Sequence, residues 1–278
     1  MKTRPLGLRL AIGLLALFAL WSFGSCDSVF GSDDDDSGGG SGGAAEATSW
    51  IRVNETSVEH PFGGTYRIAI IDKNETQMTI TFYQETEDGV VQVAGGILPY
   101  EVNGEDITFV WSHAWFDEDP GVQGITYNGT DWYEIPAGAA DFPTGGTAQI
   151  TGDTLTVEGG AGAQTFTKID FALPSDMVDT WDLNIAGSTG DLELGATSDA
   201  PAPGWGSLSY TFDTQEGSGY WKASGTTEGY LRQIYTEINE EPDLEYWEHL
   251  TPYVLAGDTL TFYNDIAKSQ GTAYDYIR

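Results

Sequence analysis

The chain has 278 residues, and its 43 Asp and Glu residues outnumber its 11 Lys and Arg residues, which gives a formal net charge of −32 at pH 7. This charge repels phosphate backbones, so it excludes nucleic acid as an expected partner. With 40% hydrophobic residues and 36 Gly, 14 Tyr and nine Trp, the composition predicts a globular, β-rich protein with a sizeable core. A single cysteine excludes an internal disulfide and a Cys-based zinc site.

The acidity has three explanations: a saline habitat, divalent-cation binding, or solubility alone. The carboxylates are spread along the chain and complete no calcium-binding loop. We therefore expect a solvated acidic surface and no metal site.

The amino terminus has the pattern of a secretory signal peptide. Basic residues occur between Met1 and Arg9, an almost purely apolar run extends from Leu10 to Phe23, and the small pair Gly24-Ser25 follows. About fourteen apolar residues are too few for a comfortable membrane span. Residues 1–25 are therefore expected to direct export.

Phe23-Gly24-Ser25-Cys26 resembles the lipobox of bacterial lipoproteins, with Phe23 in place of the commoner Leu. The resemblance implies that the signal is cut before Cys26 and that Cys26 carries a lipid. Two or three acyl chains would hold the protein stably on a bilayer. We expect an extracytoplasmic protein of the bacterial cell envelope, at the outer membrane or cell surface; an ordinary signal peptide with a chance cysteine is the alternative.

Residues 26–48 contain mostly Ser, Gly, Asp and Ala, including four consecutive aspartates at 33–36. Such a segment can bury little apolar surface, so it predicts a disordered tether.

The first β domain is expected over residues 49–172. Alternating apolar runs predict strands at 65–71, 78–84, 90–94, 97–102, 107–111 and 164–169, and the stretch 112–146 is polar, Gly-rich and irregular. Short segments around Gly104, Gly152 and Gly257 share a pattern in which a glycine and an acidic residue separate two alternating runs. Each predicts a tight β-hairpin.

A second β domain is expected over residues 173–278, because several patterns recur in the same order. Residues 179–184 correspond to 64–69, 207–212 to 78–83, 253–262 to 148–157, and 272–277 to 164–169. The simplest fold is all-β, with two tandem copies of one antiparallel β-meander of about eight strands each. The second half is expected to fold cooperatively when expressed alone.

Gly64-Thr65-Tyr66, Asp179-Thr180-Trp181 and the hairpins at Gly152 and Gly257 resemble elements of the lipocalin-like, calycin-type domains of bacterial lipoproteins. Tyr66 stands where the family has Trp, and Asp179 where it has Gly. The resemblance implies that each meander forms a closed or nearly closed antiparallel barrel that holds a small hydrophobic ligand. We therefore expect two tandem antiparallel meander barrels, with two β-sandwiches as the alternative.

No pattern in the chain predicts catalysis or a cofactor. Its three histidines are isolated from one another, and the one Gly-x-Ser-x-Gly match, residues 39–43, lies in the tether. We therefore expect that the protein is not an enzyme. We also expect it to be a monomer. A carboxylate-based glycoside hydrolase is a weaker alternative, suggested by the acidic residues that follow Trp111 and Trp115.

Aromatic side chains in or next to the stretch 112–146, and in a second acidic and aromatic stretch over residues 237–249, are the candidates for ligand binding, because flat rings with a polar edge suit sugars and apolar ligands. The candidates are Trp111, His113, Trp115, Trp132, Tyr133, Tyr246 and Trp247. Packing of these rings on the sheets is the alternative. The favoured hypothesis is capture of a small apolar ligand, with a cell-surface adhesion or structural role as the alternative.

Overall fold

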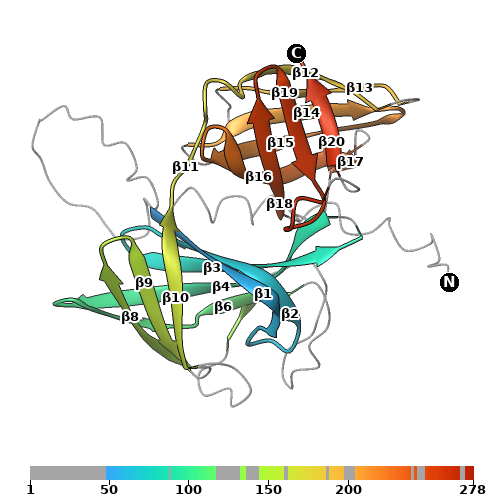
Figure 1. Ribbon diagram of the computed structural model, residues 1–278. Coiled ribbons are helices and arrows are strands. Elements are labelled where there is room, and N and C mark those ends of the chain that lie inside the picture. The colour runs from blue at the N-terminus through green and yellow to red at the C-terminus, as the bar shows by residue number, and fades with distance from the viewer. Residues whose placement is uncertain are drawn as a thin grey trace, which may run out of the picture.

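A computed structural model describes residues 48–87, 89–116, 132–135, 144–159, 162–185, 188–196, 204–238, 241–242, 248–269 and 273–278. The described chain forms two antiparallel barrels, one above the other in Figure 1. The prediction of an all-β protein with tandem barrels is therefore confirmed, and closed rings of strands replace the sandwich alternative. The predicted signal peptide, Cys26 and the tether up to residue 47 lie outside the described residues.

The first barrel is a closed ring of eight strands. Each strand pairs antiparallel with the next, and the last pairs with the first, where Trp50 lies opposite Lys168. The ring comprises β1 (Thr48–Glu59), β2 (Thr65–Lys73), β3 (Gln77–Thr86), β4 (Gly89–Asn103), β5 (Asp106–Val110), β8 (Gly145–Thr151), β9 (Thr154–Gly159) and β10 (Gly162–Ile169). The long strand β4 also pairs with β6 (His113–Phe116), and β6 pairs with β7 (Tyr133–Glu134).

The second barrel repeats this ring of eight, and its last strand again pairs with its first. It comprises β12 (Asp179–Leu183), β13 (Gly190–Leu194), β14 (Gly206–Phe212), β15 (Gln215–Ser224), β16 (Glu228–Ile238), β18 (Glu248–Ala256), β19 (Thr259–Tyr263) and β20 (Ala273–Ile277). Two short strands lie outside the ring: β11 (Phe171–Ala172), which pairs with β15, and β17 (Glu241–Pro242), which pairs with β16.

Side chains fill both barrel interiors. Successive residues of a strand point to opposite faces, and the inward positions of the strands are apolar. One buried cluster, which includes Tyr66, Leu155 and Phe166, fills the first barrel. Another, which includes Trp221 and Leu260, fills the second, and all five of these residues are at most 1% exposed.

The three predicted hairpins are confirmed. Two-residue turns join β4 to β5, β8 to β9 and β18 to β19. Gly104, Gly152 and Gly257 occupy the first central position of these turns with φ of +72°, +59° and +62°, while the acidic residue that follows each glycine has a negative φ. This is the pattern of a type II′ turn, which matches the twist of the paired strands.

The last two of these hairpins also bind the final strand of each ring. In the first barrel, the backbone N–H of Lys168 donates to the carbonyl of Asp153 over 2.6 Å. In the second, the N–H of Arg278 donates to the carbonyl of Asp258 over 3.2 Å. The repeated Gly-Asp pair therefore turns the chain and also holds the end of the final strand.

One predicted correspondence between the halves is wrong by one strand. Asp179 begins β12, the first strand of the second ring, whereas Gly64 precedes β2, the second strand of the first ring. The counterpart of Trp181 is Trp50, because both are third in the first strand of their ring and both point inward. The other three correspondences join strands at equal positions in the two rings.

The two tryptophans differ at the indole nitrogen. Nε1 of Trp181 donates to the carbonyl of Met177 over 3.0 Å, and the guanidinium of Arg278 lies 4.9 Å from its ring centre. Nε1 of Trp50 is buried and meets no acceptor among the residues that the structure describes. Trp50 and Trp181 therefore occupy equivalent positions, but among the described residues only the indole N–H of Trp181 has a hydrogen-bond acceptor.

A third apolar cluster lies between the barrels, and we call it the seam. From the first barrel it contains Ile68, Ile70, Tyr83 and Val90, all on outward-facing positions, and Leu250 of the second barrel packs on them. Strand β18 also pairs with β4 there, with His249 opposite Val91. The seam thus covers apolar surface on the outside of both barrels.

The turn geometry predicts different costs for two glycine substitutions in the first barrel. A methyl group added at Gly152 or at Gly159 would meet no atom within 4 Å, but only Gly152 has a positive φ. Gly152→Ala should lower the free energy of unfolding by about 1–2 kcal/mol, because an L-residue resists this conformation. Gly159→Ala should change it by less than about 1 kcal/mol. Urea denaturation of both variants measures the difference, and equal midpoints would contradict the turn assignment.

Candidate functional site

The aromatic residues predicted to bind a ligand lie in one region of the first barrel as far as they are described. Trp111, His113, Trp115, Trp132 and Tyr133 lie on or beside β6 and β7, next to β4. Tyr246 and Trp247 lie outside the described residues.

Two adjacent glycines of β4 place the rings of Trp111 and Trp132 on opposite faces of the sheet. A Cβ added at Gly96 would lie 2.1 Å from the ring of Trp111, and one added at Gly95 would lie 3.1 Å from the ring of Trp132. Since neighbouring residues of a strand point to opposite faces, Trp111 and Trp132 lie on different sides of β4. The absent side chains make room for both indoles.

The inward group packs in the wall of the first barrel. Trp111 meets Phe62 edge to face at 5.4 Å, and Tyr133 stacks on Phe116 at 5.0 Å between ring centres. Both belong to the rim of the barrel core. Their geometry is that of core aromatic pairs.

The outward group shares the face of Gly95. Trp115 lies opposite Gly95 and is 6% exposed, and His113 lies opposite Ile97. A ring nitrogen of His113 lies 3.0 Å from the hydroxyl of Ser112. The five described candidates are thus divided between two faces, and a ligand-binding role for them stays a prediction.

Sequence reasoning missed His60, which packs with the inward group. Its ring stacks on Phe82 at 5.6 Å, and its Nδ1 accepts a hydrogen bond from the N–H of Phe62. Gly64 leaves room for the ring, since a Cβ there would lie 2.4 Å from Nε2. Burial lowers the pKa of His60 to about 4, so the imidazole is neutral at pH 7.

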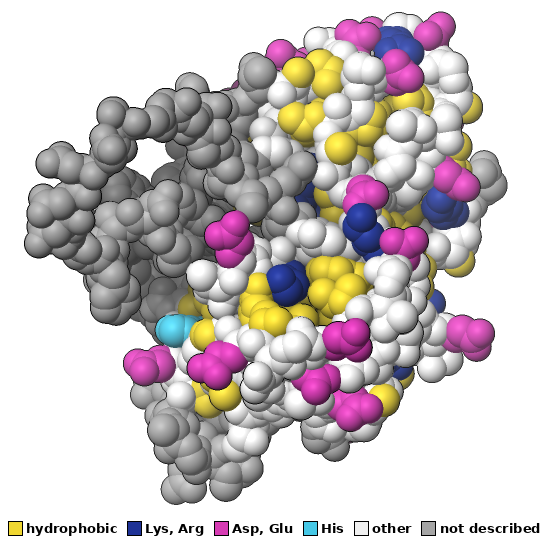
Figure 2. All heavy atoms as spheres, turned by 90° about the vertical axis from the view of Figure 1, so that its left-hand side faces the viewer, with side chains coloured by type: hydrophobic (Ala, Val, Ile, Leu, Met, Phe, Trp, Pro, Cys, Tyr) yellow, Lys and Arg dark blue, Asp and Glu magenta, His cyan; other side chains and the backbone are white. Residues whose placement is uncertain are grey.

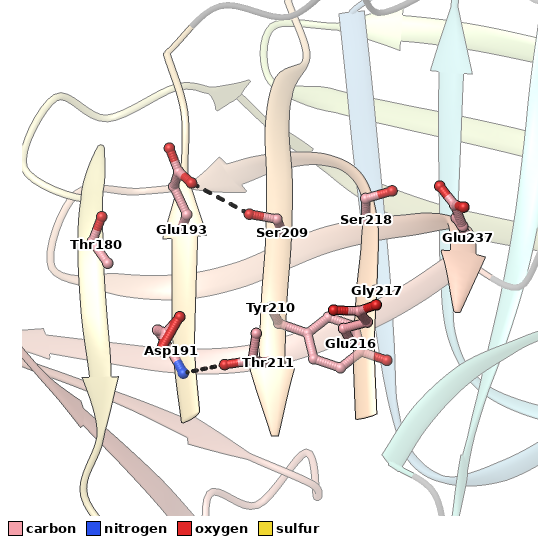
Figure 3. A pocket seen from close by; sticks show the side chains of 10 residues that line it. All are labelled: Thr180, Asp191, Glu193, Ser209, Tyr210, Thr211, Glu216, Gly217, Ser218 and Glu237. Carbon is pink, nitrogen blue, oxygen red and sulfur yellow. Dashed lines mark hydrogen bonds between the residues drawn. The ribbon is translucent and has the colours of Figure 1, made fainter. Parts of the chain in front are cut away.

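The second barrel has a shallow depression of about 310 Å³ on its outer face. Figure 3 shows a row of side chains that crosses five neighbouring strands there, and the strand register gives the same order: Thr180, Glu193, Ser209, Ser218 and Glu237. The hydroxyl of Ser209 lies 3.4 Å from a carboxylate oxygen of Glu193.

A second row contains Asp191, Thr211 and Glu216, which lie opposite one another on β13, β14 and β15. The hydroxyl of Thr211 accepts a hydrogen bond from the N–H of Asp191 over 3.1 Å. The ring of Tyr210 lies beneath this surface, against Gly217.

The lining consists of carboxylates, hydroxyls and one aromatic ring, with no basic side chain among its ten residues. Such a surface offers hydrogen-bond acceptors to a cationic or polyhydroxyl group and disfavours phosphates. Among the described residues, no group of three or more His, Cys, Asp or Glu side chains could hold a metal ion. The outward polar positions were visible in the sequence, but their alignment across five strands was not.

Another depression, of about 400 Å³, lies where the barrels meet. Ile169 of the first barrel lines it together with Tyr230 and an ion pair in which Lys268 lies 3.3 Å from Glu228. Both depressions described here are therefore on the outside of the barrels.

Negative side chains are scattered over the face of both barrels seen in Figure 2, between hydrophobic patches and few basic residues. The described part of the chain has no helix long and apolar enough to cross a membrane. Compared with protein-family models, curated proteins and solved structures, the chain gives no match.

The buried histidine predicts a pH dependence. Because the pKa of His60 is lowered to about 4 in the folded protein, the unfolded chain binds more protons below pH 6.5. Stability should therefore fall as the pH drops from about 6.5 to about 4, by roughly 3 kcal/mol from this group. His60→Phe should remove this part of the slope in urea denaturation across that range. An unchanged slope would contradict the assignment.

Proposed function

We propose that the protein is a lipid-anchored, extracytoplasmic binding module that engages a partner through its outer surfaces and is not an enzyme. The filled barrel interiors are the observation that carries this proposal. A barrel that captures a small apolar molecule needs an internal cavity of a few hundred cubic ångströms. Here the inward side chains pack against one another, and Tyr66, Leu155, Trp221 and Leu260 are at most 1% exposed.

Between the two binding roles predicted from sequence, this packing favours cell-surface interaction over ligand capture inside a barrel. The depressions of about 310 and 400 Å³ on the outside support the same choice. Closed barrels with filled interiors are stiff, so the side chains on their outer faces are held ready for a partner.

The anchoring part of the proposal comes from the amino-terminal pattern. A basic segment, an apolar run and small residues precede Cys26, and a Gly- and Asp-rich segment separates that cysteine from the first strand. A lipid on Cys26 would hold the barrels near a bilayer while leaving their outer faces accessible.

Replacing the cysteine tests the anchor. Cys26→Ser removes the thiol that would carry the lipid, so the full chain should move from the membrane fraction to the soluble extracytoplasmic fraction. Fractionation followed by immunodetection measures this, with Ser25→Ala as the control that keeps the thiol. Retention of the Cys26→Ser protein in the membrane fraction would contradict the anchor.

Filled interiors predict that the wild-type protein takes up no small apolar probe. Titration with a fluorescent fatty-acid analogue and with benzene should give neither saturable binding nor a thermal shift. Leu260→Ala, which empties a fully buried position of the second barrel, should gain benzene binding and serves as the positive control. One-to-one binding of the fatty-acid analogue by the wild type would refute the surface role and restore capture inside a barrel.

A further inference from the structure

A buried group of three charged residues joins the two barrels, and we call it the triad. Arg232 points outward from β16 of the second barrel, and its Nε and Nη2 donate to the two carboxylate oxygens of Glu248 on β18. Its Nη1 donates to Oδ2 of Asp72 on β2 of the first barrel over 2.8 Å. The side chains of Arg232, Glu248 and Asp72 are 4%, 9% and 18% exposed.

The shape of the guanidinium explains how one residue can serve both barrels. Its planar fork binds one carboxylate with two nitrogens and still directs the third nitrogen elsewhere. Asp72 is held in turn by the hydroxyl of Ser49, which donates to Oδ1 over 2.5 Å. A lysine ammonium has no such fork and could not hold both carboxylates in this geometry.

Aromatic rings cover the triad. The guanidinium carbon of Arg232 lies 5.2 Å from the ring centre of Phe171 and 5.6 Å from that of Trp205. Phe171 belongs to β11, which leads from the first barrel to the second and pairs with β15. The segment that links the barrels therefore also shields the charges from water.

Burial and the neighbouring positive charges have opposite effects on the pKa of Asp72. Burial raises the pKa of its carboxyl, but Arg232 and Lys222 outweigh burial, and the pKa is about 2. Asp72 is thus charged at neutral pH. Removing one partner of a buried ion pair is strongly unfavourable, because it leaves the other charge unpaired. The bond between Asp72 and Arg232 can form only while both barrels are folded.

The seam adds an apolar contribution in the same place. Leu250 lies opposite Arg232 in the register of β16 and β18, and it packs on Ile68, Ile70 and Val90 of the first barrel. Unfolding of either barrel would expose this surface on the other and leave Arg232 with one carboxylate fewer or none.

From these contacts we infer that the triad and the seam couple the two barrels into one cooperative folding unit. This differs from the expectation that the second half folds on its own. Each barrel closes its own ring of strands, but outward-facing side chains of each are also buried and bound by side chains of the other.

Differential scanning calorimetry of the full chain tests the coupling. The wild type should unfold in one transition with a ratio of calorimetric to van't Hoff enthalpy of about one. Asp72→Asn keeps the side-chain size but removes the charge that Arg232 binds across the seam. It should give two transitions, with the ratio rising to about two, as for two units that unfold separately.

Asp258→Asn is the control, since it removes an exposed Arg–Asp pair that lies wholly within the second barrel, where Nε of Arg278 lies 3.4 Å from Oδ1 of Asp258. It should keep the single transition. Two transitions in the wild type, a single transition in Asp72→Asn, or separation of the transitions in Asp258→Asn as well would each overturn the inference.

A second variant covers the case in which Asp72→Asn does not fold. Phe171→Ala leaves all three charges in place but removes the ring that shields them. It should also raise the enthalpy ratio above that of the wild type, and Phe171→Tyr should retain the wild-type ratio. An enthalpy ratio of about one in Phe171→Ala would count against the shielding role and overturn the inference.

Discussion

The indole of Trp181 packs inside the second barrel beneath Arg278, whose backbone N–H binds the hairpin carbonyl of Asp258. Core packing, turn and ring closure therefore meet at one end of the barrel. The first barrel uses Trp50, Lys168 and Asp153 at equivalent places. Because side chains fill both interiors, the two barrels contact each other through outward positions of their strands.

Much of this fold could be predicted from local patterns. Period-two alternation predicted the strands, and a glycine followed by an acidic residue predicted the turns, because both depend on neighbouring residues only. The first-strand correspondence went wrong because Gly64-Thr65-Tyr66 resembles a strand start as closely as Thr48-Ser49-Trp50 does. Only the pairing of β1 with β10 shows that β1 is the first strand of the ring, that Gly64-Thr65-Tyr66 leads into the second strand, and that Trp50 is the counterpart of Trp181.

The candidate site was harder to predict, because residues from one stretch of the sequence can lie on opposite faces of a sheet. Trp111 and Trp132 are near each other in sequence, yet Gly96 and Gly95 hold them on opposite sides of β4. The row from Thr180 to Glu237 depends on the register of five strands. Asp72 and Arg232 are 160 positions apart, and no local pattern marks either as a partner.

Arg232 also bears on how the two barrels arose. In a solitary barrel its side chain would stand in water beside Glu248, and its third nitrogen would have no carboxylate from another barrel to bind. If the chain descends from a duplicated single barrel, the bond to Asp72 could form only after the copies became joined. The repeated hairpins then record the common ancestor, whereas the guanidinium and its two carboxylates record the later adaptation of each copy to its neighbour.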